Sequence, residues 1–334
     1  MKSFVILLGV VAADFEAIGL NYQAAWGCNY PSTKHISANL QFSTSNLTLI
    51  NEFYKHGGVS LYPFTGWTIS DPDKADPKTG YCHSPIPRFS NNTRCKAKNP
   101  KWETEWTTTY QKIKPFIANG TIAGIFLGDE QMWAGVKLSD MEEVTDQIKK
   151  DCPSCITFIN EAQDVAVCNF NRMNGTWAEN GQCLPKSLDW FGFDYYDGSF
   201  SYGENSGWEV QRRAFEEQIY PRLHPHQRIV PTCISFFDRN AITREKADEY
   251  CAFNAQQYLH WALEDHRLIG VFPFYWPATE PQWWDLAQLP NCAQTWSGIG
   301  QIVKATPPSN PYWKPTSCVV NTEVRDYNWC DRYQ

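Results

Sequence analysis

Eight short apolar segments, each followed by a longer amphipathic one, constrain the fold of this chain more than any other feature. Alternation of this kind is typical of a parallel sheet covered by its connecting helices. Eight such units predict a closed (β/α)8 TIM-type barrel, and the main alternative is a doubly wound open sheet. No glycine-rich phosphate loop follows the first segment, which disfavours the nucleotide-binding form of that alternative. The predicted strands are 18–25, 35–42, 58–64, 122–128, 156–160, 188–195, 228–235 and 268–275.

The length of 334 residues fits one barrel with additions at both ends. Residues 1–13 have the pattern of a secretory signal peptide, a positive start followed by a short apolar run and small residues. We expect the barrel domain over 14–305 and an irregular, proline-rich tail over 306–334, tied to it by disulfides. Long loops at 66–102 and 164–186 follow predicted strands, and in a barrel such loops build the active-site face.

Twelve cysteines and four glycosylation sequons agree with passage through an oxidising secretory compartment. The even number of cysteines allows up to six disulfides, and Cys82 with Cys95 and Cys168 with Cys183 would staple the long loops. We therefore predict a secreted, extracellular glycoprotein. The sequons begin at Asn46, Asn91, Asn119 and Asn174.

The pair Cys152 and Cys155 has the spacing of a redox motif or of half a zinc site. No second close pair of cysteines accompanies it, and the only close pair of histidines, His224 and His226, lies in a proline-rich turn. We predict a structural disulfide between these two cysteines. Nothing in the sequence indicates a metal site or an organic cofactor.

The composition limits the possible partners. With 29 basic and 36 acidic residues, the net charge of -7 argues against nucleic acid or an anionic membrane surface. No segment approaches the roughly 20 apolar residues that membrane insertion requires. Aromatic residues make up 15% of the chain, more than a core needs, which favours a surface or cleft lined by rings. An oligosaccharide or polysaccharide is the partner that such rings suit.

Carboxylates gather at the carboxyl ends of three predicted strands, where a barrel places its active site. Glycosidic bond cleavage needs such a set, because one carboxyl protonates the leaving oxygen and another acts as nucleophile, base or stabiliser. Acids at strand ends can also cap the following helix, which is the alternative for each of them. The candidate catalytic residues are Glu130, Asp194, Glu161 and Asp129.

Regular strand alternation predicts which of the paired acids faces inward. Phe126, Gly128 and Glu130 share one side of the fourth strand, and Asp129 takes the other. We therefore expect Glu130 to point into the barrel mouth. Aromatic and polar residues near the strand ends are candidates for substrate binding: Tyr196, Asp197, Trp67, Trp133, Tyr195 and Trp276.

The order of these features resembles the chitinase-like family 18 of glycoside hydrolases. The matching features are 35–42, 58–67, Glu130, the pair Tyr196 and Asp197, and Trp276. The resemblance implies a (β/α)8 barrel in which Glu130 is the acid and the substrate's own acetamido group is the nucleophile. The family carries aspartates two and four residues before this Glu, where this chain has Gly128 and Phe126. Either Asp194 or Glu161 takes the missing role, or the chain does not perform that reaction.

Another comparison is with barrels that carry an acid–base Glu after Asn on the fourth strand and a nucleophilic Glu on the seventh. Asn160 and Glu161 imitate the first half of that pattern, on the fifth predicted strand here. Residues 228–238 contain no Glu, so the second half is missing.

The sequence predicts a secreted glycoside hydrolase that acts on a neutral or amino-sugar polysaccharide. Glu130 is the expected general acid, with its pKa raised by burial, and Asp194 or Glu161 is the partner carboxylate. The alternative is a catalytically inactive barrel that serves as a lectin or an extracellular-matrix glycoprotein. A third possibility is a structural glycoprotein whose aromatic residues form a protein–protein interface.

Overall fold

The computed structural model describes residues 22–23, 37–42, 44–70, 95–162, 184–196, 207–265, 267–274 and 282–305. The expected signal peptide, the expected C-terminal tail, most of the two long loops, Asp197 and Trp276 lie outside the described residues. The predictions for those parts stay predictions.

Nine parallel strands form one continuous curved sheet; eight of them make one path, and each of the eight overlaps one predicted segment, with β6 and β7 ending one and two residues beyond theirs. Their order in the sheet is β1-β12-β10-β8-β7-β6-β3-β2, and β9 (Arg228–Ile229) also pairs with β8. The strands therefore follow one another in chain order, with the last beside the first. The doubly wound alternative is wrong, because it reverses the strand order partway through the sheet. The eight strands are β1 (Tyr22–Gln23), β2 (Leu40–Gln41), β3 (Val59–Pro63), β6 (Ile122–Asp129), β7 (Ile156–Ala162), β8 (Trp190–Asp194), β10 (Thr232–Ile234) and β12 (Gly270–Phe274).

The strand order is that of a ring opened between β1 and β2. Within the described part of the chain these two strands are not hydrogen-bonded to each other. The fold shown here is thus a curled, parallel sheet, in agreement with the coarse prediction.

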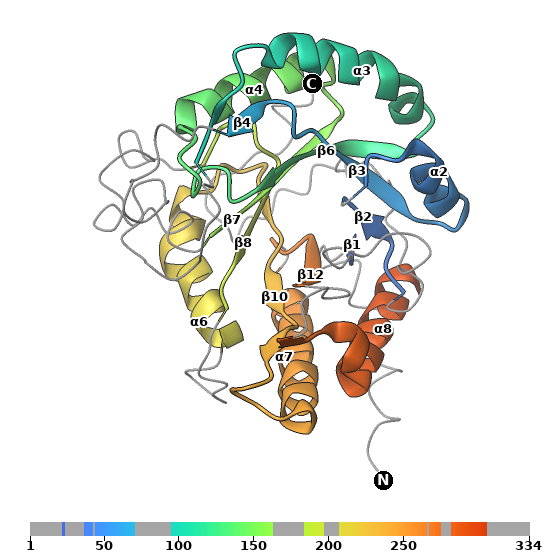
Figure 1. The fold of residues 1–334 in the computed structure, drawn as a ribbon, viewed down its shortest axis with the longest axis vertical. Coiled ribbons are helices and arrows are strands. Elements are labelled where there is room, and N and C mark those ends of the chain that lie inside the picture. Colours follow the sequence, from blue (N-terminus) through green and yellow to red (C-terminus); the bar gives the residue numbers. More distant parts are fainter. Residues whose placement is uncertain are drawn as a thin grey trace.

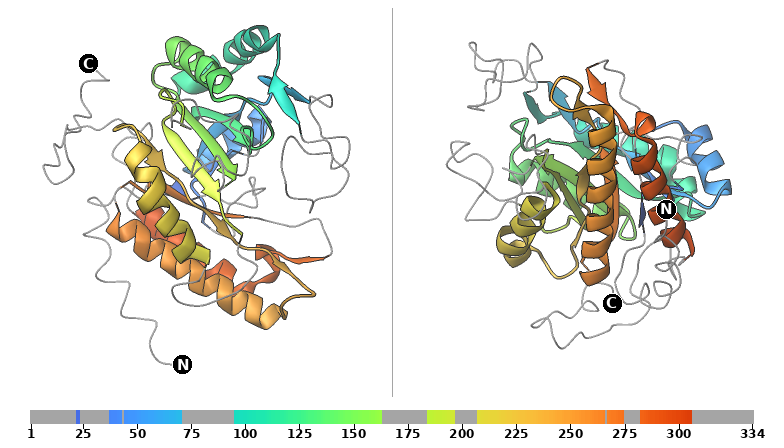
Figure 2. Two further views of the ribbon diagram at one scale, coloured as in Figure 1. Left: turned by 90° about the vertical axis from the view of Figure 1, so that its left-hand side faces the viewer. Right: turned by 90° about the horizontal axis from the view of Figure 1, so that it is seen from below.

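Helices cover the outside of the curved sheet (Figure 1), and two further views agree (Figure 2). A π-helical turn (Phe215–Ile219) and a 3-10 turn (Tyr220–Arg222) continue α6, and a further 3-10 turn (Leu286–Gln288) precedes α8. Among the described residues, no helix has the length and apolar character that crossing a membrane would need. The helices are α2 (Leu47–Lys55), α3 (Trp102–Ala118), α4 (Leu138–Asp151), α6 (Gly207–Ala214), α7 (Arg244–Glu264) and α8 (Pro290–Ala305).

Two small antiparallel sheets stand apart from the main sheet. In one, β4 (Thr68–Ser70) pairs with β5 (Lys96–Lys98). In the other, β11 (Phe237–Asp238) pairs with β13 (Trp283–Trp284). The second small sheet follows β10 directly and therefore lies at the carboxyl ends of the strands.

The sheet separates two hydrophobic cores, which shows the side to which each strand residue points. Four phenylalanines meet inside the curve, with the ring centroids of the contacting pairs 4.8–5.7 Å apart: Phe42, directly after β2, and Phe126, Phe158 and Phe272 on β6, β7 and β12. Residues one position out of phase, such as Ile159, belong to the larger core between the sheet and the helices. A strand residue in phase with these phenylalanines therefore points to the inner side.

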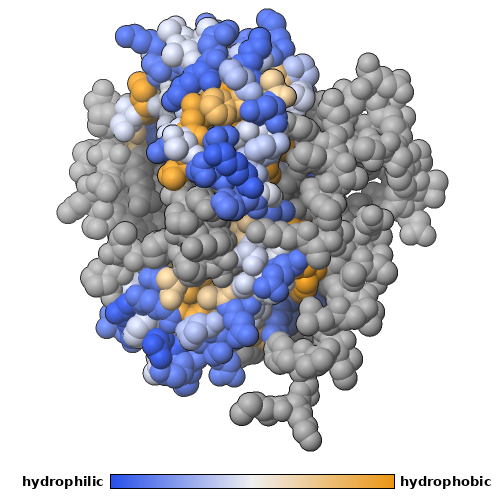
Figure 3. Space-filling model, turned by 90° about the vertical axis from the view of Figure 1, so that its right-hand side faces the viewer, coloured by the Kyte–Doolittle hydropathy of each residue, from blue (hydrophilic) through white to orange (hydrophobic). Residues whose placement is uncertain are grey.

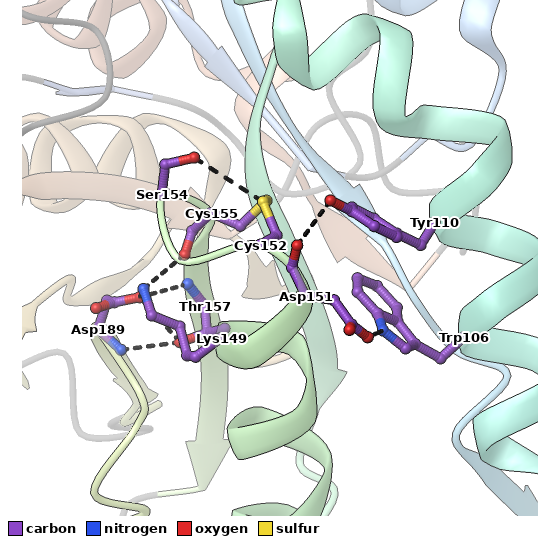
Figure 4. The surroundings of a disulfide bond; sticks show 9 residues. All are labelled: Trp106, Tyr110, Lys149, Asp151, Cys152, Ser154, Cys155, Thr157 and Asp189. Carbon is purple, nitrogen blue, oxygen red and sulfur yellow. Dashed lines mark hydrogen bonds and ion pairs between the residues drawn. A yellow bond between two sulfur atoms is a disulfide. The ribbon is translucent and has the colours of Figure 1, made fainter.

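The predicted disulfide between Cys152 and Cys155 is present, at the junction of α4 and β7. Around it, Trp106 Nε1 and the Tyr110 hydroxyl both donate to Asp151, and Lys149 donates to the Cys155 carbonyl and forms an ion pair with Asp189 (Figure 4). This network joins α3, α4 and the start of β8. It lies where β7 begins, at the opposite end of the strand from the candidate acids, which agrees with a structural role.

A second disulfide, Cys251–Cys292, joins α7 to α8, and Cys95 is also disulfide-bonded. The expected pairing of Cys168 with Cys183 lies outside the described residues. Cys233, on β10, is a buried free thiol. The full number of six disulfides that the cysteine count allows is therefore not reached.

Candidate active site

A β-bulge near the end of β6 determines which acid enters the site. Phe126 lies opposite Phe158 on β7, and Asp129 lies opposite Asn160, so β6 has one residue more than β7 between these pairs. The extra residue shifts the alternation by one position. Asp129 therefore shares the inner side with Phe126, and the prediction that Asp129 faces outward is wrong.

Glycine at position 128 makes this bulge possible. Its φ is +118°, a backbone conformation that residues other than glycine rarely adopt. A Cβ at this position would lie 2.1 Å from Gln131 Nε2. Gln131 is buried and its amide also donates to the Asp129 carbonyl. The glycine thus allows a buried side chain to pack against the bulge that turns Asp129 inward.

Asn160 holds two carboxylates at the inner ends of neighbouring strands. Its Nδ2 donates to Asp129 Oδ1 (2.9 Å) and to Asp194 Oδ2 (3.0 Å). Its Oδ1 accepts from the hydroxyl of Thr232 on β10 (2.8 Å), which fixes the orientation of the amide. Because both carboxylates share one nitrogen, the two accepting oxygens are at most about 6 Å apart.

The surroundings of Asp194 favour its neutral form. It is 7% exposed, and burial is the largest cause that raises its pKa well above the usual value, followed by the charges of Glu130 and Asp129. Hydrogen bonds from Asn160 and Tyr196 lower the pKa of Asp194, but their effect is smaller than that of burial. Burial and the neighbouring acids also raise the pKa of the Tyr196 hydroxyl, which is hydrogen-bonded to Asp194.

Glu130 occupies a strained backbone position directly after Asp129. Its φ is +51°, one of two positive values among the non-glycine residues described, and its amide donates to the Asn160 carbonyl (2.8 Å). Its side chain is partly exposed. Left-handed backbone at a non-glycine residue costs about 1–2 kcal/mol and is concentrated at functional sites.

Replacing Glu130 by Gly is expected to stabilise the fold. Gly removes the left-handed strain, and it also removes the repulsion between Glu130 and the neighbouring acids. Glu130→Gln removes the repulsion alone. Urea denaturation should therefore rank the unfolding free energy as Glu130→Gly above Glu130→Gln above wild type, with about 1 kcal/mol between the two variants. A glycine variant that is less stable than the glutamine variant would contradict the assignment of strain to this position.

Glu161 does not reach the inner side of the sheet. It lies opposite Phe193, one position out of phase with Asn160, and is 0% exposed. Its two oxygens accept from the backbone amides of Met132 (2.9 Å) and Trp133 (3.2 Å), in the turn after β6. Glu161 thus caps backbone amides, as the alternative to a catalytic role predicted. By doing so it stabilises the turn that follows Glu130.

Burial raises the pKa of Glu161 to about 8, against the lowering effect of these two amide bonds. Between about pH 4.5 and pH 8 the folded protein keeps a proton that the unfolded chain releases, so the unfolding free energy falls as the pH rises, by up to about 1.4 kcal/mol per unit. Glu161→Gln removes the contribution of Glu161 to the dependence of the unfolding free energy on pH. Urea midpoints at pH 5, 6.5 and 8 test the prediction, which fails if the wild-type and variant curves are parallel.

The predicted aromatic binding residues differ in burial and in their contacts with the site. Trp67 is 0% exposed and donates from Nε1 to the Leu127 carbonyl, so the prediction that it lines a subsite is wrong. Trp133 and Tyr195 are half-buried and pack against the outer core. Tyr196 is hydrogen-bonded to Asp194 and contacts the site directly.

Sequence reasoning missed Asn160 and Thr232 as members of the site. A usable signal was present, because Asn160 is in phase with the inner residue Phe158, two positions earlier. Among the described residues, no group of three or more His, Cys, Asp or Glu is placed to hold a metal ion.

No protein-family model and no curated protein sequence matches this chain. Among solved structures, the fold is similar to that of the GH2 β-galacturonidase from Eisenbergiella tayi bound to galacturonate, with a TM-score of 0.50 and 10% identity, covering 83% of this chain and 50% of that one. This likeness concerns the fold alone. Xylanase 10B from Thermotoga maritima has a TM-score of 0.48 and 10% identity, with 88% and 98% of the two chains covered.

β-Glucuronidase 2 from Bacteroides uniformis gives a TM-score of 0.41 and 12% identity, with 73% of this chain covered. This chain spans 27% of the length of that glucuronidase. It is therefore similar to part of a larger protein in that case.

Proposed function

We propose that this protein is a secreted glycoside hydrolase built on a closed (β/α)8 barrel. The observation that carries the proposal is the joint placement of Asp129, Glu130 and Asp194 at the carboxyl ends of β6 and β8, with Asn160 between the two aspartates. Carboxyl groups in different protonation states, close together at strand ends, are what glycosidic bond cleavage needs.

Glu130 is the proton donor in this proposal, and Asp129 is the ionised partner. Both are partly exposed and can meet a substrate, whereas Asp194 is nearly buried. If Asp194 is neutral, the Asn160 amide stabilises a single negative charge, that of Asp129. In this proposal Asp194 therefore positions Asp129 and does not itself react.

The bulge also bears on the resemblance to family 18. The aspartate that the family places before its catalytic Glu is replaced here by Gly128. Asp129 reaches the inner side instead and is available for the same task, which is to steer the acetamido group of an amino sugar. On a neutral sugar, Asp129 would itself be the nucleophile.

A neutral or amino-sugar polysaccharide suits this site better than an anionic one. Asp129 and Glu130 raise the pKa of Asp194 by repulsion, and they would repel a uronate in the same way. An extracellular polysaccharide also agrees with the secretion that the cysteines and sequons predict.

A protein–protein interface receives little support. On the face drawn in Figure 3, the described residues are mainly hydrophilic and the hydrophobic patches among them are small and separate. Among the described residues, the large hydrophobic side chains that are well exposed are Tyr54 (42%) and Ile69 (43%). They lie on different elements, so they do not indicate a docking surface.

Turnover of a glycan panel tests the proposal. The panel contains xylan, cellulose, mannan and chitin oligosaccharides, and wild type is compared with Glu130→Gln. Hydrolysis of at least one glycan by the wild type, reduced at least about 100-fold in the variant, is the expected result. Binding without any hydrolysis would instead establish the lectin alternative, and equal turnover by both proteins would overturn the role of Glu130.

A further inference from the structure

A row of aromatic side chains continues from the carboxylates to the small β11–β13 sheet. Phe236 lies at its centre, with its ring centroid 5.0 Å from Tyr196, 5.4 Å from Phe274 and 5.3 Å from Trp283, each at a steep angle. Tyr196 is in turn hydrogen-bonded to Asp194. All four aromatic side chains are half-buried, so each keeps surface that solvent can reach. The row therefore connects the candidate active site to Trp283.

The two tryptophans of β13 have different surroundings. Trp284 pairs with the buried Phe237, lies beneath the Arg239 guanidinium (4.1 Å) and donates from Nε1 to the Ile242 carbonyl (3.1 Å). These contacts give Trp284 a structural role. Trp283 pairs with Asp238, so these two side chains share the opposite face of the small sheet.

Trp283 and Asp238 together have the chemistry that recognises a sugar ring. An indole offers a flat apolar surface for the apolar face of a pyranose, and a carboxylate beside it accepts hydrogen bonds from the hydroxyl groups. Asp238 is half-buried and accepts from the Asn240 amide through Oδ1 (2.8 Å), which holds the carboxylate in place. The negative charge also disfavours an acidic sugar here.

We propose that Trp283 and Asp238 form an outer subsite that binds a neutral sugar unit of the substrate chain, away from the bond that is cleaved. The position of this subsite relative to cleavage rests on the proposed function. The aromatic row places it at the end of a path from Asp194 through Tyr196 and Phe236. A ligand long enough to follow that path gains the contact, and a short one does not.

Binding of short and long oligosaccharides tests the subsite without requiring turnover. Calorimetric titrations use di- and hexasaccharides of xylose, glucose and N-acetylglucosamine, with Glu130→Gln as the parent protein to prevent hydrolysis. Adding Trp283→Ala should weaken hexasaccharide binding about tenfold, which is about 1.4 kcal/mol in the binding free energy, and change disaccharide binding less than about twofold. Trp283→Phe should restore most of the loss.

Tyr54→Ala is the matched control, because Tyr54 is an exposed aromatic residue on α2 whose hydroxyl donates to the Asn119 carbonyl. It should change neither affinity. Hexasaccharide binding that is unchanged by Trp283→Ala, or equal weakening for both lengths, would overturn the subsite and leave the proposed hydrolase standing. Binding without hydrolysis by the wild type would overturn the hydrolase and keep the subsite, and failure of the parent to bind any glycan would overturn both.

Discussion

Replacing Asp129 by Asn should lower kcat/KM about 1000-fold, whereas the same replacement at Asp194 should lower it less than about tenfold. The two aspartates accept hydrogen bonds from one nitrogen of Asn160, but the proposed mechanism needs a negative charge only on Asp129. Burial and the acidic neighbours raise the pKa of Asp194, which favours its neutral form. Asn is close in shape to a neutral Asp, so it removes the essential charge only at position 129.

Steady-state kinetics on the glycan that the wild type hydrolyses best provide the measurement. Urea denaturation of both variants serves as the control for folding. Equal losses at the two positions would contradict the division of roles between Asp129 and Asp194. A larger loss at Asp194 would reverse it.

Gly128→Ala should reduce both activity and stability strongly. A Cβ at this position meets Gln131 Nε2 at 2.1 Å, and the φ of +118° is unfavourable for any side chain. We expect a loss of about 2–4 kcal/mol in unfolding free energy, from backbone strain and overpacking together. Because relief of the backbone strain at a φ of +118° moves the bulge and therefore Asp129, kcat/KM should fall at least about 100-fold in the molecules that still fold.

Gly298→Ala is the matched control for this variant. Gly298 lies in α8, and a Cβ there meets nothing within 4 Å. Alanine should stabilise that helix by about 0.5–1 kcal/mol and leave kcat/KM unchanged. If Gly128→Ala behaves like this control, the bulge does not position the active site.

The arrangement of the strands could be predicted from the sequence because each strand is a short apolar run between polar segments. Buried parallel strands have this pattern, and the helices between them show a different period. Each of the eight predicted segments overlaps a strand of the sheet. In the described part of the structure, β1 and β2 are not hydrogen-bonded to each other. Closure of the sheet into a barrel is therefore part of the proposal.

The direction of the acids could not be predicted, because it depends on one extra residue. Regular alternation placed Asp129 outside, and the bulge after Phe126 brings it to the inner side. Gly128 was the available signal, since a lone glycine within a strand often marks a bulge. The sequence nevertheless identified the correct strand ends, because the carboxyl ends of parallel strands lie at one edge whichever side chain points inward.

Helix starts show the same limit of local patterns. Thr243 caps α7 through a hydrogen bond from the Lys246 amide, which agrees with the preference of Thr for that position. The capping-box pattern at 139–142 predicts a start at Ser139, but α4 begins at the buried Leu138 and has no side-chain cap. Packing of Leu138 against the core prevails over the local signal.

Leaving-group dependence tests the central claim most directly, namely that Glu130 donates the proton to the departing oxygen. A 2,4-dinitrophenyl glycoside releases a stable anion and needs little protonation, whereas a natural oligosaccharide of the same sugar needs a full proton transfer. For Glu130→Gln, kcat/KM should fall at least about 1000-fold on the oligosaccharide and less than about tenfold on the aryl glycoside. An equal loss of kcat/KM on both substrates would contradict the account.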